Sequence, residues 1–191
     1  MRSFSRAWRI GVVVTGIAAF ATSALAQAPA AHKYIGADKC AMCHKAEAKG
    51  NQYGQWLKSA HSKALETLKG EKAIAIGKEK GLKTPPAEND ACLKCHTTGH
   101  GADKALFEAT FKADGVQCEA CHGAGSDYKG MAVMKDKALA VAAGLIIPNE
   151  KTCVKCHNAE SPTFKSFDFK TAYAKIAHPR PAPVPAPPPA K

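Results

Sequence analysis

The stretch Cys118-Glu119-Ala120-Cys121-His122 holds two cysteines separated by two residues, with a histidine directly after the second cysteine. The same spacing occurs three more times, and the four stretches together contain all eight cysteines of the 191-residue chain. Eight cysteines would otherwise suggest four disulfides. The repeated order of residues indicates that these cysteines do not form disulfides. The other stretches are Cys40-Ala41-Met42-Cys43-His44, Cys92-Leu93-Lys94-Cys95-His96 and Cys153-Val154-Lys155-Cys156-His157.

Each stretch has the spacing that attaches and ligates a haem. Two thiols separated by two residues can each form a thioether with one vinyl group of the haem, and the following histidine then faces the iron. A redox dithiol or half of a zinc site also uses paired cysteines, but neither requires a histidine after every pair. We therefore predict four covalently bound haem c groups. The predicted attachment residues are Cys40, Cys43, Cys92, Cys95, Cys118, Cys121, Cys153 and Cys156, and the predicted proximal iron ligands are His44, His96, His122 and His157.

The first 26 residues have the pattern of a secretory signal peptide. Three arginines precede an apolar run from Ile10 to Leu25, and small residues around Ala26 offer a cleavage point. A retained membrane anchor is the alternative, but the run is shorter than the ~20 residues that span a bilayer. We expect a periplasmic mature chain with no membrane span. Residues 27–178 would form the tetrahaem domain, and residues 179–191, with seven prolines, a disordered tail.

The charge of the chain argues against nucleic acid as a partner. Removal of the three signal-peptide arginines lowers the formal charge from +11 to +8. Two propionates on each of four haems would bring the holoprotein to about +4 when oxidised and about zero when reduced. The lysines are spread along the chain without interleaved aromatic residues that could stack on bases. We expect redox proteins as partners, with an acidic docking patch on one of them as one possibility and an ordinary solvated surface as the other.

The pattern of apolar residues predicts a mostly α fold, a single small domain built around the four haems, with little regular β structure. The clearest amphipathic helix runs from Tyr53 to Leu68, and shorter helices are predicted at 73–80, 134–143 and 170–177. Large aliphatic residues are few, so most of the hydrophobic core should be porphyrin. We therefore predict that the haem-free chain is largely unfolded.

The distal iron ligands must come from a short inventory, because four of the eight histidines are proximal. His61 lies on the apolar stripe of the predicted helix at 53–68, and His178 ends the last predicted helix, so we predict both as iron ligands. His100 follows His96 too closely to reach the opposite face of the same haem. It would ligate a neighbouring haem or stand as a polar group beside an open iron. His32, in the leader before the first motif, is a further candidate.

Two methionines extend this inventory. Met131 and Met134 follow the third motif, where a thioether ligand would raise the reduction potential of a haem relative to two histidines. The alternative is that these flexible side chains pack in the core.

Several segments outside the motifs resemble the tetrahaem cytochrome c-554 family, best characterised in nitrifying bacteria. The resemblance extends from Tyr34 to His178. Beside the haem motifs, the segments that carry it are Tyr34-Ile35-Gly36, Trp56-Leu57-Lys58-Ser59-Ala60-His61, Thr97-Thr98-Gly99, Gly115-Val116-Gln117, Gly123, Ser161-Pro162 and Phe167-Asp168-Phe169.

The resemblance implies a mostly helical fold with haems in closely stacked pairs. It implies that three haems have two histidine ligands and that the haem of the second motif is five-coordinate. It also implies that His178 serves the first haem and that His61 serves the third or the fourth. The best-known member takes electrons from hydroxylamine oxidoreductase and passes them toward the membrane quinone system.

This sequence departs from the family at two places. Members tend to have an aromatic residue where His100 stands, and a histidine downstream of the third motif where this chain has methionines and lysines. Either His100 replaces the missing ligand from a different place, or a second haem is methionine-ligated or open.

These features predict an electron-transfer protein rather than an enzyme, with no catalytic residues assigned. Histidine on both faces of an iron keeps the ligands the same in both oxidation states, so little rearrangement opposes electron transfer. The alternative is a haem enzyme or gas binder that reduces nitric oxide or another small nitrogen oxide at an open iron of the second motif. A subunit that connects a catalytic partner to the respiratory chain is the third possibility.

Overall fold

A computed structural model describes residues 31–178. The predicted signal peptide, at residues 1–26, and the predicted tail, at residues 179–191, lie outside the described residues. The described chain is mostly helical, and its β pairing consists of an isolated bridge between Tyr34 and Phe107. The predicted fold class, mostly α with little regular β, is confirmed.

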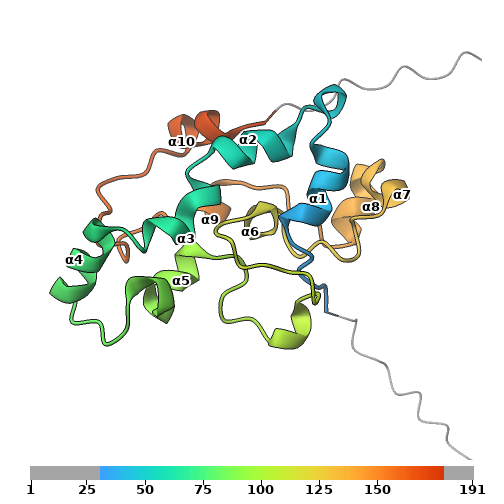
Figure 1. Cartoon of the computed structure of the whole chain (residues 1–191). Coiled ribbons are helices and arrows are strands. Elements are labelled where there is room, and N and C mark those ends of the chain that lie inside the picture. Colours follow the sequence, from blue (N-terminus) through green and yellow to red (C-terminus); the bar gives the residue numbers. More distant parts are fainter. Residues whose placement is uncertain (1–30, 179–191) are drawn as a thin grey trace, which may run out of the picture. The chain divides into compact units, whose positions relative to one another are not determined.

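The helices of the described chain are short, and the longest has nine residues. Helices of this length are marginal in water by themselves, so they depend on what packs against them. None of those between residues 31 and 178 has the length and apolar character needed to cross a bilayer. Figure 1 shows them in chain order: α1 (Ala37–His44), α2 (Gln52–Lys58), α3 (Ala64–Thr67), α4 (Glu71–Glu79), α5 (Asp90–His96), α6 (Cys118–His122), α7 (Met131–Met134), α8 (Lys137–Ala142), α9 (Glu150–Cys153) and α10 (Phe169–Ile176).

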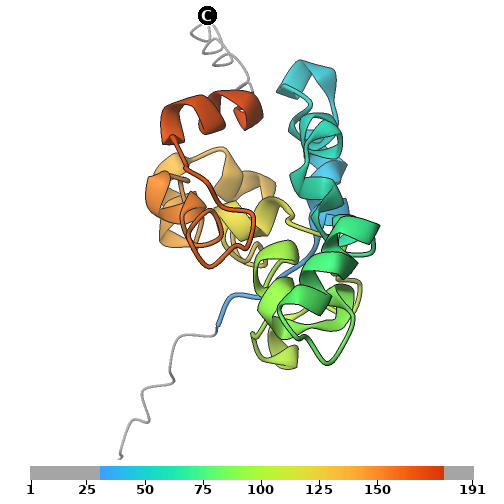
Figure 2. The same ribbon diagram turned by 90° about the vertical axis from the view of Figure 1, so that its left-hand side faces the viewer.

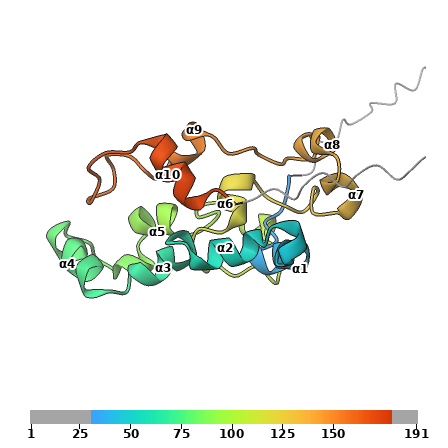
Figure 3. The same ribbon diagram turned by 90° about the horizontal axis from the view of Figure 1, so that it is seen from above.

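Four 3-10 turns accompany these helices in the described chain: η1 (Glu47–Lys49), η2 (His61–Lys63), η3 (Pro86–Glu88) and η4 (Lys104–Leu106). Two views of the ribbon show helices α1 to α4 in one row and helices α8 to α10 in a second row, with α6 between them (Figures 2 and 3). Helix α1 contacts α6, and α3 contacts α5, so the first motif meets the third and the second motif meets the first row.

The helix predicted from Tyr53 to Leu68 is broken, so the prediction of one continuous helix is wrong. Helix α2 ends at Lys58, and Ser59 is extended, with φ −81° and ψ 160°. The Ser59 hydroxyl donates a hydrogen bond to the carbonyl oxygen of Trp56 (2.7 Å). The carbonyl oxygen of His61 accepts hydrogen bonds from the N–H of Ala64, which closes the 3-10 turn η2, and from the N–H of Val116 (3.0 Å). The break therefore ties the His61 segment to the third motif.

The other helix predictions agree with the structure to different degrees. The helices predicted at 73–80 and 170–177 correspond to α4 and α10. The helix predicted at 134–143 is two helices instead, because the Asp136 carboxylate accepts hydrogen bonds from the N–H groups of Ala138 (2.8 Å) and Leu139 (3.1 Å) and so begins α8.

The apolar core is very small for a chain of this length. Among residues 31–178, only five hydrophobic residues are fully buried: Ile35, Ala37, Leu68, Tyr128 and Ala140. Large apolar side chains near the first and third motifs stay exposed, including Met42 (74%) and Met131 (62%). A chain that buries so little apolar surface needs other apolar groups to complete its core.

Three buried polar residues stabilise the meeting point of several segments: Thr98, Gln117 and Glu119, which we call the polar hub. The Gln117 side-chain oxygen accepts a hydrogen bond from the N–H of Ala37 (2.7 Å). The Thr98 hydroxyl accepts from the N–H of Gln117 (2.7 Å) and donates to the carbonyl oxygen of Gly115 (3.0 Å). Buried polar groups are tolerated when they are paired in this way. The hub thus joins the chain before the first motif, after the second motif and before the third.

Gly115 shows why the chain needs a glycine at this meeting point. Its φ of +112° lies in a region that L-residues rarely adopt. A Cβ at this position would lie 3.0 Å from the carbonyl oxygen of His61, which belongs to the neighbouring backbone. The close approach of the two backbones is therefore possible only without a side chain at Gly115.

Candidate functional site

The four motifs have a common local structure. In the first three, the helix ends at the histidine, because α1, α5 and α6 end at His44, His96 and His122. In the fourth, α9 ends at Cys153, and the N–H of His157 donates a hydrogen bond to the carbonyl oxygen of Cys153 (3.0 Å). Residues three apart lie on the same face of a helix, so both cysteines of each of the first three motifs share one helix face.

Three of the motif histidines are held by their Nδ1 atoms. Nδ1 of His96 lies 2.6 Å from the carbonyl oxygen of Ala64, and Nδ1 of His122 lies 3.1 Å from that of Ile146. Nδ1 of His44 lies 3.1 Å from the side-chain oxygen of Gln52. Because a carbonyl oxygen only accepts, Nδ1 donates in these contacts. Nε2 is then free to bind a metal, which is the usual second partner of a ligating histidine.

His61 faces His157, the histidine of the fourth motif. The centres of the two rings are 5.9 Å apart, with the planes at 74°. Two imidazoles that bind one metal from opposite sides have ring centres about 6 Å apart, since each metal–nitrogen bond is about 2 Å. The His157 ring also stacks on Phe167, with ring centres 5.0 Å apart. This pair therefore has the spacing of two axial ligands.

His178 and His122 form a second pair with the same spacing. Their ring centres are 6.0 Å apart and their planes are inclined by 36°. His44 is also near, because its charge contributes to the lowered pKa of His178 after the larger effect of burial. The structure thus places His178 beside the histidine of the third motif, with the histidine of the first motif nearby.

Burial favours the neutral form of three of the facing histidines. It is the main cause that lowers the pKa of His61, His122 and His178 below the ordinary value of 6.5, and a neighbouring histidine lowers each of them further. Only the neutral imidazole can bind iron, so these lowered pKa values favour metal binding near neutral pH.

Contacts between cysteines give the spatial order of the motifs. The neighbouring thiol of Cys118, and then burial, raise the pKa of Cys40. Burial and then the neighbouring Cys95 raise the pKa of Cys156 to about 12. Cys121 lies within electrostatic reach of Cys153. The attachment segments therefore follow one another in the order first, third, fourth, second.

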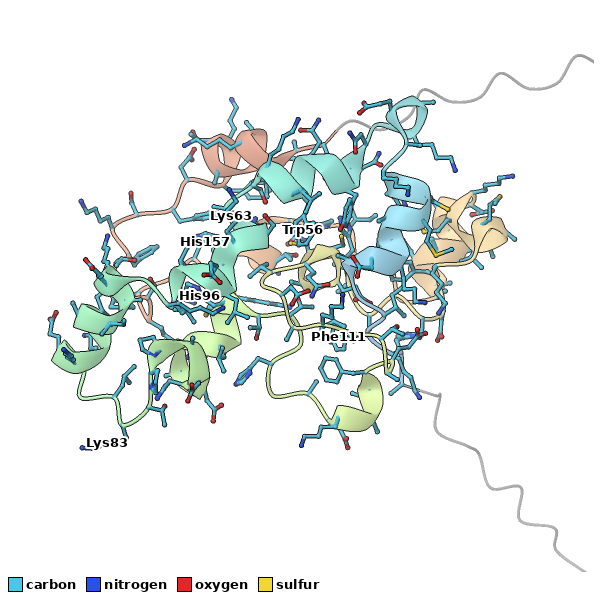
Figure 4. All side chains as sticks on the ribbon, in the orientation of Figure 1. Trp56, Lys63, Lys83, His96, Phe111 and His157 are labelled. Atoms are coloured by element: carbon cyan, nitrogen blue, oxygen red, sulfur yellow. The ribbon has the colours of Figure 1, made fainter. Side chains whose placement is uncertain are left out.

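A cavity of about 940 Å³ lies at the second and fourth motifs. This volume is near the upper end of the roughly 300–1,000 Å³ that is common for ligand sites. His61, His96 and His157 line it, and Figure 4 labels the last two beside the same part of the ribbon. Most of the remaining lining is apolar, with four charged residues: Lys72, Lys80, Glu160 and Lys175. It includes the cysteines of both motifs: Cys92, Cys95, Cys153 and Cys156, with Cys121 of the third motif. We call this space the histidine cavity. Its thiols, imidazoles and apolar walls fit haem.

The remaining histidine candidates are held by carboxylates. Nε2 of His100 lies 3.1 Å from the carboxylate of Asp90, and His100 does not line the histidine cavity. Nδ1 of His32 lies 2.6 Å from the carboxylate of Asp127. The structure therefore brings neither residue opposite a motif histidine.

The polar hub is the part of the site that sequence reasoning missed. A signal for one member was present, because Glu119 is the only acidic residue between the paired cysteines of any motif. The corresponding positions in the first, second and fourth motifs carry Ala41, Leu93 and Val154. No comparable signal marked Thr98 and Gln117 as buried.

Comparisons with known proteins agree on one family. The family model described as cytochrome c554 and c-prime matches residues 39–123, which include the first three motifs. Cytochrome c-554 of Nitrosomonas europaea is 35% identical over 103 residues, which cover 51% of this chain and 41% of that protein. The match thus spans less than half the length of that relative. No solved structure matches the chain significantly.

Proposed function

We propose that the chain, which is similar to the cytochrome c-554 family, is a periplasmic c-type cytochrome with four haems that transfers electrons between redox proteins. Membership of a cytochrome c family would bring covalently bound haem c, which suits an electron carrier. The number four rests on the four motifs, each of which has its own pair of cysteines and its own histidine.

The observation that best supports this proposal is the pair of facing histidines at each of two motifs. Rings 5.9 Å apart at His61 and His157, and 6.0 Å apart at His122 and His178, have the spacing of axial ligands on one iron. We propose His61 as the distal ligand of the fourth haem and His178 as that of the third. A ligand set that stays the same in both oxidation states suits electron transfer.

The side chains would hold the cofactor in three ways. The cysteines would tether it, the histidines would bind its iron, and the apolar walls of the histidine cavity would exclude water. When bound, haem supplies an iron that carries one electron by alternating between the ferric and ferrous states. The hydrogen bonds at Nδ1 of His44, His96 and His122 would fix the orientation of the imidazoles.

The partners are proposed from the family resemblance. The electron donor would be an enzyme like hydroxylamine oxidoreductase, and the acceptor a membrane cytochrome connected to the quinone pool. The relative's printed name gives the cytochrome but no partner, so both remain proposals.

A second candidate function concerns the second motif. Within residues 31–178 no ring contact joins His96 to another imidazole, and His96 lines the large histidine cavity. An open iron there would bind nitric oxide or reduce a small nitrogen oxide. The electron-carrier function is favoured, since two motifs already have facing histidines.

The test is the low-temperature EPR spectrum of the purified, oxidised holoprotein, with the haem number taken from its intact mass. The proposal predicts four haems, low-spin signals from the third and fourth, and a gain of about one high-spin haem in His61→Ala. The matched control His100→Ala should leave the spectrum unchanged. A mass without four haems, or no spin change in His61→Ala, would contradict the proposal. A ferrous nitrosyl signal after nitric oxide is added to the reduced protein would establish an open iron.

A further inference from the structure

Glu119 is a buried carboxylate inside the third motif, between its two cysteines. Only 2% of the residue is exposed. Its Oε1 accepts hydrogen bonds from the N–H groups of Ile35 (2.9 Å) and Gly125 (2.7 Å), and its Oε2 accepts from that of Gly36 (2.8 Å). Backbone N–H donors stabilise a negative charge without adding a positive one.

No cation balances this carboxylate in the described chain. None of the ion pairs within residues 31–178 includes Glu119. The acidic group of Glu108, in contrast, is paired with Lys129 at the surface. Glu119 therefore places a fixed, uncompensated negative charge in the interior, where water screens it little.

The charge lies between the first and the third attachment segments. Ile35 and Gly36 directly precede α1, which carries the first motif, and Gly125 follows the third. The negative charge of Glu119 is also felt at Cys40, where it adds to the larger effects of the neighbouring Cys118 thiol and burial in raising the thiol pKa. Glu119 does not line the histidine cavity of the second and fourth motifs.

We propose that Glu119 lowers the reduction potentials of the haems at the first and third motifs, and not those of the second and fourth. This inference rests on the proposed function, since it requires haem at these motifs. Reduction adds one electron at each iron and neither makes nor breaks a bond. A fixed negative charge nearby disfavours that added electron, and the effect is large where the surroundings are apolar. Glu119 is thus a tuning residue rather than a catalytic one.

The experiment is an EPR-monitored redox titration of Glu119→Gln holoprotein with dithionite. Glutamine keeps the size of the side chain and removes its charge. We expect two haems to shift toward the reduced form by roughly tenfold in their ferric–ferrous equilibrium, the size expected of one close charge at an effective dielectric of about 20. The other two should stay within about twofold.

Two further variants make the result specific. Glu108→Gln removes the same charge from the surface, where salt screens it, and should shift no haem by more than about twofold. Glu119→Asp keeps the buried charge, so its potentials should stay near those of the native protein even if its stability falls. If Glu119→Gln yields no holoprotein, Glu119→Asp decides: native potentials support the fixed charge, and raised potentials overturn it.

The failure of this inference can be told apart from the failure of the proposed function. Unchanged potentials in Glu119→Gln with all haems attached, or equal shifts of all the haems, would overturn the role of Glu119 alone. Absence of haem from the native protein would instead contradict the proposed function.

Discussion

The polar hub and the histidine cavity are two different solutions to the same problem, namely how to hold two motifs together. At the hub, buried side chains hydrogen-bond to backbone groups, with distances of 2.7 Å at Ala37 and Gln117. At the cavity, the second and fourth motifs face a space of about 940 Å³ lined mostly by apolar side chains. Protein groups therefore hold the first and third motifs together. The second and fourth motifs depend on what fills the cavity.

This difference teaches that the cofactor contributes unequally to the stability of the two regions. Helices of nine residues or fewer gain most of their stability from packing, and α4 and α5 pack beside the cavity. The hub has its partners within the chain. We therefore expect the cavity region to lose its structure first when haem is absent.

The largest effect should follow from complete removal of the haems. The chain expressed without haem attachment should show no cooperative thermal unfolding in circular dichroism, because only five hydrophobic residues of the described chain are fully buried. Amide hydrogen exchange should find the remaining protection near Ile35, Ala37 and Gln117, and little in α4 or α10.

The holoprotein is the control for this measurement and should melt cooperatively. A cooperative, native-like transition in the haem-free chain would show that the protein core suffices by itself. Uniform protection of both regions would remove the distinction between the hub and the cavity.

The sequence predicted the residue types of the site better than it predicted which of those residues face one another. Cysteine and histidine spacing is a local property, so the attachment residues and proximal histidines followed directly from the motifs and remain predictions for experiment. The apolar stripe predicted that His61 points inward, and His61 does line the histidine cavity. Its partner, His157, is 96 positions away in the chain, and no local pattern could identify that pairing.

The helix from Tyr53 to Leu68 shows where periodicity fails. Its apolar spacing is continuous, but the Ser59 hydroxyl competes for the backbone by bonding to the carbonyl oxygen of Trp56. The carbonyl oxygen of His61 accepts from Val116 as well as from Ala64 in the 3-10 turn η2. The bond from Val116 is a contact between distant segments, which only the folded chain reveals. The segments at Tyr34, Thr98 and Gln117 resemble the family although they are far apart in the chain. In the structure they meet at the polar hub, where Ile35 and Gly36 bond to Glu119 and Gln117 bonds to Thr98.

A smaller effect is expected from Thr98→Val, which keeps the shape of the side chain. The change removes the hydroxyl that bonds both Gly115 and Gln117 and leaves two buried backbone groups unpaired. We expect the holoprotein to lose about 1–3 kcal/mol of unfolding free energy in denaturant titrations. Thr110→Val, at an exposed site outside the histidine cavity, should cost less than about 0.5 kcal/mol. Equal losses in the two variants would mean that the hub does not stabilise the fold.

The smallest effect concerns the ion pair of Lys94 with Glu160, which joins the second motif to the segment after the fourth. The hydrogen bond and charge of Lys94 lower the pKa of Glu160 below its ordinary 4.5. The stabilisation is therefore present above pH 4.5 and is lost as the pH falls through the lowered pKa. Both side chains are largely exposed, so salt should screen the pair.

Glu160→Gln should lower the melting temperature of the holoprotein slightly at neutral pH and low salt, and not at all in strong acid or high salt. Glu79→Gln, at an exposed site outside the ion pairs of residues 31–178, should lack this dependence. A large, salt-independent loss in Glu160→Gln would mean that protein contacts, rather than the cofactor, hold the second and fourth motifs together.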